Sequence, residues 1–148
     1  MSRKLILLMT PLALVSAFAP LAHANAQILG TCLVDSLNGK ERKQLAKWIY
    51  FALAAHPDLK SYSNISSEDR IETDRGVGSL ITRLLAEDCA TELKEAKNTD
   101  PLAMQRAFEM VGRVAMQELM TNQEVTAATS DFSRYVDQEK INEALVEK

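Results

Sequence analysis

Apolar residues recur every three or four positions along nearly the whole chain after residue 25, and they rarely alternate with polar residues. This spacing places side chains on one face of an α-helix, whereas a half-exposed strand requires alternation. Residues that interrupt helices are scarce, because the 148-residue chain has 5 glycines and 4 prolines. The pattern therefore predicts an all-α fold, a single-domain bundle of about five helices.

Capping residues and helix-stopping residues divide this pattern into segments. The expected helices cover residues 26–37, residue 39 to before Pro57, Ser66 or Ser67 to Asn98, residues 101–120 and residues 123–136, with a last short helix after Asp137. Asn38 is expected to cap the second helix, with Glu41 as its partner in a capping box. Residues 57–66 form a polar connection with one helical turn near residues 59–62. The glycines at 76 and 78 leave open a separate short helix over residues 66–73.

The segment Pro101–Met120 is the most apolar of these helices. Asp100 and Pro101 form a typical helix start, a capping acid followed by proline at the first helical position. One apolar face of this segment is formed by Met104, Ala107, Phe108, Val111, Val114, Ala115 and Leu119, and Met110, Met116 and Met120 widen it. A helix with so wide an apolar face is expected at the centre of the fold. Gly112 disfavours the helix by ~1 kcal/mol relative to alanine, so close approach of another helix is expected there.

The first 24 residues have the three parts of a cleavable secretory signal. Arg3 and Lys4 give a positive start, residues 5–18 form an apolar run, and Ala22-His23-Ala24 supplies small residues for signal peptidase. The apolar run is short for a membrane-spanning helix, which needs ~20 residues. We therefore expect cleavage after Ala24, a mature helical domain of residues 25–148, and a periplasmic location.

Cys32 and Cys89 are the two cysteines of the chain. In an oxidising compartment such a pair favours one structural disulfide. The closed loop is long, and chain entropy alone predicts a stabilisation of ~4 kcal/mol. A redox or metal-binding role is less favoured because there is no Cys-x-x-Cys spacing. Lipidation of Cys32 is a weaker alternative, since Thr31 precedes it where a smaller residue is preferred.

The sequence contains no clear catalytic, metal-binding or cofactor-binding arrangement. His56 is the one histidine after cleavage, so a Ser-His-Asp or Cys-His set would have to use it. Its place at the end of a helix favours interaction with the free carbonyl groups instead. The acidic residues within 68–74 suit a helix start and lack the spacing of a calcium loop. Glu87 and Asp88 are adjacent and therefore point in different directions. No cofactor is expected.

Four methionines are candidates for a partner-binding surface: Met104, Met110, Met116 and Met120. Methionine-rich surfaces adapt to varied apolar partners. The alternative is that these side chains fill gaps in a helical core. A wide apolar face on the helix that carries them favours an apolar groove. The basic run of residues 40–47 next to Trp48 could contact a membrane surface, but Trp48 shares a face with Leu45 and Ala52, which favours core packing.

Two segments resemble parts of small exported proteins of Gram-negative bacteria of uncharacterised function: Asn38–Ile49, running on to Ala55-His56-Pro57, and Ala107–Met116. This resemblance implies export and no particular activity. Thr31-Cys32 and Cys89 also resemble the single-disulfide pattern of periplasmic acid-stress chaperones, which implies a stress-related role as an alternative.

These features lead us to expect a non-enzymatic periplasmic protein that binds another protein through an apolar helical groove. One alternative is a chaperone activated by acid or stress, because protonation of its many carboxylates could loosen the fold. Another is a small hydrolase that uses carboxylates alone. The formal net charge of −3 argues against nucleic acid as a partner, since phosphate binding needs a basic stripe. Membrane insertion of the mature chain is not expected, and the oligomeric state is left open.

Overall fold

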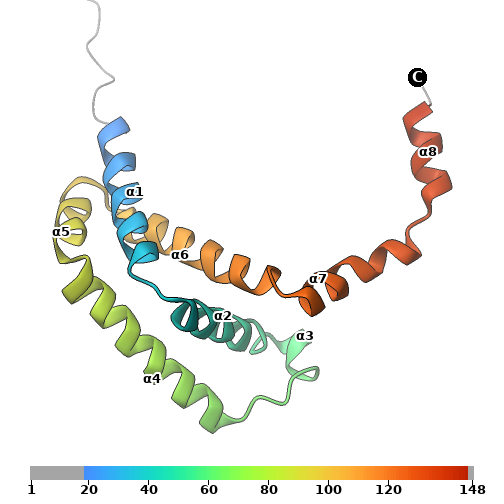
Figure 1. The fold of residues 1–148 in the computed structure, drawn as a ribbon, viewed down its shortest axis with the longest axis horizontal. Helices are drawn as coiled ribbons and strands as arrows, with labels where there is room; N and C mark the ends of the chain where they lie inside the picture. The colour runs from blue at the N-terminus through green and yellow to red at the C-terminus, as the bar shows by residue number, and fades with distance from the viewer. Residues whose placement is uncertain (1–18, 147–148) are drawn as a thin grey trace, which may run out of the picture.

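The computed structural model describes residues 19–146, and every regular element in this range is helical (Figure 1). In chain order the elements are α1 (Ala19–Asp35), α2 (Gly39–Leu53), α3 (Pro57–Lys60), α4 (Ser67–Arg83), the π-helix η1 (Leu84–Asp88), α5 (Ala90–Thr99), α6 (Ala103–Met120), α7 (Gln123–Ser130), the 3-10 helix η2 (Asp131–Tyr135) and α8 (Gln138–Val146). The all-α prediction is confirmed, but the described chain has eight α-helices rather than about five.

The third predicted helix is divided at Cys89. The segment Ser67–Arg83 is continuous, so no separate helix forms over residues 66–73. The chain then makes one turn of π-helix, and Cys89 leaves the helical conformation with φ −124° and ψ 30°. Cys89 is fully buried and lies at disulfide-bonding distance from Cys32 of α1, as predicted. Periodicity could not show the break, because Cys89 continues the apolar stripe that precedes it.

The start of α6 also differs from the prediction, since the helix begins at Ala103 rather than Pro101. The backbone N–H of Ala103 donates to the carbonyl oxygen of Asp100 at 3.1 Å, and the N–H of Leu102 donates to the Asp100 side chain at 2.8 Å. These bonds form a turn with Pro101 at its second position, where proline is favoured. Asp100 therefore organises a turn before the helix instead of capping it directly.

The N-terminal helix both begins and ends earlier in the chain than predicted. Of the expected signal sequence, residues 1–18 lie outside the described part of the chain. Residues 19–24 form the first part of α1. The helix continues past Ala24, the expected cleavage point, and ends at Asp35. Leu37 follows in the connection to α2, yet it remains buried in the core.

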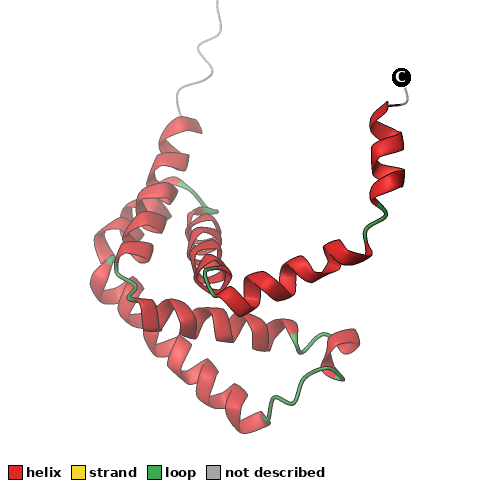
Figure 2. Cartoon of the chain, turned by 45° about the vertical axis from the view of Figure 1, so that its right-hand side comes forward, coloured by secondary structure: helices red, strands yellow, loops and turns green. Residues whose placement is uncertain are grey.

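The core is formed by α1, α2, α4, α5 and α6, with α6 in contact with three of the others (Figures 1 and 2). The buried positions of α6 are spaced every four residues: Ala103, Ala107, Val111 and Ala115. Three of them are alanines, which lets α1 and α2 approach the α6 backbone closely. Leu29 and Leu33 of α1 and Leu84 of η1 are fully buried against this framework. The predicted central position of the helix is confirmed.

Local hydrogen bonds start the two helices that cover one side of the core. Asn38 and Glu41 form the predicted capping box of α2. Ser66 and Asp69 form an equivalent box at the start of α4. Trp48 packs against the core, as predicted, and its indole N–H donates to Asp74 Oδ1 at 3.0 Å across the α2–α4 interface.

The chain after Asn122 leaves the core as an extended arm (Figures 1 and 2). The C-terminal arm, defined as residues 123–146, comprises α7, η2 and α8. The expected helix over residues 123–136 is divided here, because a 3-10 turn replaces its second half. No residue of these three elements is buried. Among the described residues, no helix combines the length and the apolar content needed to cross a bilayer.

Candidate functional site

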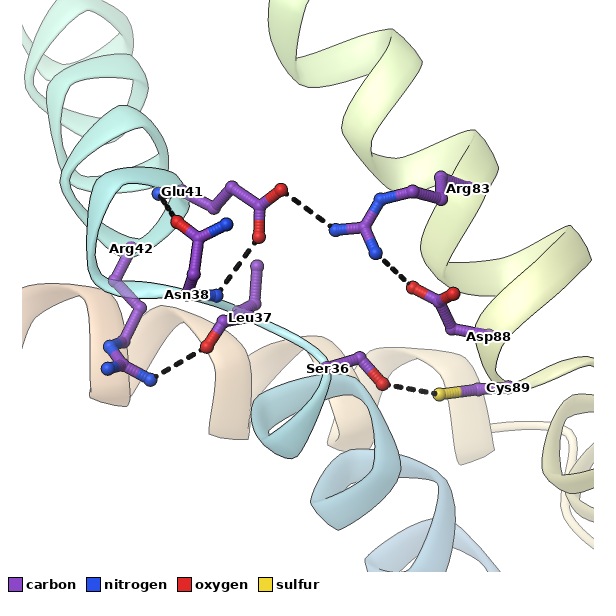
Figure 3. Close-up of polar contacts among 8 residues, drawn as sticks. All are labelled: Ser36, Leu37, Asn38, Glu41, Arg42, Arg83, Asp88 and Cys89. Atoms are coloured by element: carbon purple, nitrogen blue, oxygen red, sulfur yellow. Dashed lines mark hydrogen bonds and ion pairs between the residues drawn. The ribbon is translucent and has the colours of Figure 1, made fainter.

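A polar network joins α2 to the end of α4 beside the disulfide (Figure 3). Arg83 donates to Glu41 Oε1 at 2.9 Å and forms an ion pair with Asp88. The hydroxyl of Ser36 lies 3.8 Å from Sγ of Cys89, and only the hydroxyl can donate because that sulfur is in the disulfide. The charged groups of this network are paired with one another. Its role is therefore to hold the helices in register.

His56 lies on the outside of the molecule, between α2 and α3. It is the N-cap of α3, and its Nδ1 accepts a hydrogen bond from the backbone N–H of Asp58 at 3.3 Å. The predicted interaction with the carbonyl end of α2 is replaced by this contact, because Pro57 starts a new helical turn at once. Among the residues that the structure describes, no three His, Cys, Asp or Glu side chains are grouped closely enough to hold a metal ion.

The structure separates the four candidate methionines into two pairs. Met104 and Met110 are half-buried, and Met104 packs against the core cluster. Met116 and Met120 are 37% and 49% exposed. The four side chains therefore do not form one continuous exposed surface. The exposed pair lies at the end of α6, where the C-terminal arm begins.

The close helix approach predicted for Gly112 occurs at a different glycine. A Cβ atom built at Gly112 would meet nothing within 4 Å, so no helix packs there. A Cβ at Gly30 of α1 would lie 3.1 Å from Sδ and Cε of Met110 and 3.4 Å from Cα of Ala107. Gly30 is thus the point where α1 and α6 cross closely, and Met110 fills the space above it.

The C-terminal arm carries large apolar side chains without burying any of them. Tyr135 and Phe132 are 87% and 68% exposed. Three further exposed residues are Ile141, Leu145 and Val146. Exposed apolar side chains that are grouped on one segment are typical of interaction surfaces, whereas isolated ones are common on any protein.

Hydrogen bonds fix the direction in which the arm leaves α6. The side chain of Asn122 accepts from the backbone N–H groups of Glu124 and Val125, at 2.9 and 3.1 Å, and so caps α7. The hydroxyl of Thr126 donates to the carbonyl oxygen of Met120 at 3.0 Å, across the junction. The arm therefore projects from the core in a defined direction and does not fold back on it.

A shallow hollow of about 480 Å³ lies between α2 and α4. Its lining residues are Lys40, Lys43, Gln44, Lys47, Glu72, Thr73 and Gly76. We refer to it as the lysine groove. A Cβ at Gly76 would lie 2.6 Å from Nε2 of Gln44, so the absence of a side chain there lets the two helices meet at the groove floor. Three lysines against one glutamate make the groove positively charged.

A second hollow, of about 540 Å³, lies between α5 and the start of α6. It is lined by Leu93, Lys97, Asp100, Pro101 and Met104. Asp100 is buried, with 6% exposure, and forms an ion pair with Arg106. Because its other carboxylate oxygen accepts from Leu102 N–H at 2.8 Å, Asp100 is held in a structural role at this turn.

Comparison of the chain with protein-family models, with curated protein sequences and with solved structures finds no match in any of the three. The resemblance to small exported proteins of Gram-negative bacteria therefore stays a prediction from the sequence.

Proposed function

We propose that this protein is a non-enzymatic binding protein of the bacterial periplasm, and that it binds another polypeptide through its C-terminal arm. The observation that carries the proposal is the composition of the arm, which exposes five large apolar side chains and buries none. Ordered helices with exposed apolar side chains are stabilised when a partner covers those side chains.

Of the four candidate methionines, we assign only Met116 and Met120 to the partner-binding surface. Met116 and Met120 lie at the base of the arm and extend its apolar surface onto the end of α6. Met104 and Met110 serve the packing of α6 against its neighbours. Flexible methionine side chains at the base would let the surface adapt to a partner.

The periplasmic location rests on the sequence. Residues 1–24 have the pattern of a cleavable signal, and a paired Cys32 and Cys89 suits an oxidising compartment. A protein in that compartment meets unfolded exported chains as well as folded partners. The chaperone alternative therefore uses the same arm. A dedicated binding protein would contact one partner through the arm, whereas a chaperone would contact many.

The test is site-specific photo-crosslinking in the native host. A photoreactive residue placed at Phe132 or Tyr135 is expected to crosslink to a defined polypeptide, while the same residue at the exposed position Asn98 of α5 is not. One recurrent product supports a dedicated binding protein, and a broad set of products that grows at acid pH supports the chaperone alternative. Absence of any crosslink from the arm would contradict the proposal.

A further inference from the structure

The lysine groove and the C-terminal arm have complementary charges. Lys40, Lys43 and Lys47 follow one another at intervals of three and four residues, so they lie along one face of α2. The arm carries five acidic residues and two basic residues: Glu124, Asp131, Asp137, Glu139 and Glu143 against Arg134 and Lys140. A positive groove and a negative arm on the same chain attract one another when two copies meet.

The spacing of the charges also agrees between the two surfaces. Glu139 and Glu143 are four residues apart on α8, so their carboxylates lie on one face, one turn from each other. Lys43 and Lys47 have the same separation on α2. An α-helix rises about 1.5 Å per residue, and both pairs therefore span about 6 Å. Lys43 lies 3.9 Å from Glu118 of α6, and Lys47 lies over the ring of Phe51. Two such helices side by side can pair both carboxylates with lysines at once if the exposed Lys43 exchanges Glu118 for a carboxylate of α8.

Apolar residues adjoin the charged residues of both surfaces, in opposite order along the chain. On α2, Tyr50 and Leu53 follow the lysines and are 50% and 57% exposed. On the arm, Phe132 and Tyr135 precede the acidic residues of α8. If the arm lies antiparallel to α2, its aromatic residues reach Tyr50 and Leu53 while the carboxylates of α8 reach the lysines. Figure 1 shows α8 turned from the line of α7 and η2 after the extended residue Val136, so docking of both parts requires a change of direction at this residue.

The arm cannot reach the groove of its own chain in this conformation. The hydrogen bonds of Asn122 and Thr126 fix the orientation of α7 relative to the end of α6. The elements η2 and α8 then extend away from the core (Figures 1 and 2). The lysine groove lies on the core, between α2 and α4. An arm that is directed outward is available to a neighbouring molecule.

We propose that the protein forms a two-fold symmetric dimer in which the arm of each copy docks along the lysine groove and the adjoining end of α2 of its partner. This inference rests on the proposed function, because it names the polypeptide that the arm binds. The interface would be reciprocal, as two-fold symmetry requires. The two arms together would bring four exposed aromatic side chains into the interface, in addition to the charged residues of α8.

Analytical ultracentrifugation of the full mature chain, over a range of concentrations, tests the proposal. We expect a reversible dimer that weakens as the salt concentration rises, because the paired charges are exposed at the rim. The double variants Lys43→Glu/Lys47→Glu and Glu139→Lys/Glu143→Lys should each raise the dimer dissociation constant by roughly tenfold or more. A mixture of the two variants should form a heterodimer in which one of the two docking sites carries exchanged charges.

A matched control makes the same charge change elsewhere. Lys94 and Lys97 of α5 are exposed and lie outside the groove, so Lys94→Glu/Lys97→Glu should leave the dissociation constant unchanged. The circular dichroism of each variant shows whether it is folded. A wild-type chain that is monomeric at all concentrations, or a dimer that the groove and arm variants leave unchanged, would overturn the dimer. An arm that still crosslinks to a different polypeptide would then leave the proposed function in place.

Discussion

Gly30 and Gly112 are both interior glycines of long helices, but their surroundings are opposite. A side-chain carbon added to Gly30 would lie 3.1 Å from the Met110 side chain and 3.4 Å from the backbone of Ala107. Gly112 faces open space. The first glycine is required by a helix crossing, and the second lowers helix stability without a packing reason.

Substitution of the two glycines should therefore have opposite effects on stability. Gly30→Val places a branched side chain in a closed contact and should reduce the free energy of unfolding by about 1–3 kcal/mol. Gly112→Ala should raise it by about 0.5–1 kcal/mol, because alanine favours the helix and nothing obstructs its methyl group. Urea denaturation measures both changes. Equal effects at the two positions would show that α1 and α6 do not cross at Gly30.

At the scale of single elements, the start of α4 couples helix formation to pH. The Ser66 hydroxyl and backbone N–H both hydrogen-bond to the Asp69 carboxylate, at 2.6 and 3.3 Å. These bonds favour the ionised form and lower the pKa of Asp69 below its usual value, with a smaller contribution from Lys47. Because the pKa is lower in the folded state, Asp69 stabilises the protein above the pKa of an unfolded aspartate, ~3.9. That stabilisation is lost as pH falls through the folded pKa.

Asp69→Asn should therefore lower the melting temperature at neutral pH and have a smaller effect in acid. The asparagine keeps the size of the side chain but cannot ionise, so the difference between variant and wild type should narrow as the pH falls below ~4. Thermal melts followed by circular dichroism between neutral and acid pH measure this. Asp35→Asn, on an exposed acid at the end of α1, is the control. A difference that stays constant with pH would refute the coupling.

Element boundaries also show where sequence patterns stop being informative. The capping box at Asn38 was predicted because it depends on residues three positions apart. Ser66 was predicted as one of two possible starts of α4, without the box that it forms with Asp69. The break at Cys89 was not predicted, since it depends on a residue of α1 that is 57 positions away. Likewise, Asp100 was predicted to cap α6 directly, but it joins a turn before α6 and forms an ion pair with Arg106.

At the scale of the whole molecule, stability should be unevenly distributed. The core helices share a cluster of buried residues, whereas α7, η2 and α8 contribute none. Segments with few buried contacts open at lower free energy than the core does.

Hydrogen exchange followed by mass spectrometry should show this difference in the intact chain. At low protein concentration the amides of residues 123–146 should exchange well before those of α6. At high concentration the arm should gain protection together with residues 40–53 of α2, because docking would cover both. Protection of the arm equal to that of α6 at all concentrations would contradict the uneven distribution. α5 is the internal reference, since docking leaves it uncovered.

The sequence by itself determined the helical class, the central place of the segment around residues 103–120, the pairing of Cys32 with Cys89 and the capping box at Asn38. Each of these depends on spacing along one chain segment or on the presence of just two cysteines. Only the tertiary structure decided which glycine lies at a helix crossing, which methionines are exposed and that the last three elements extend as an arm. These features depend on which faces of distant helices meet, and a periodic apolar pattern does not specify the partner of each face.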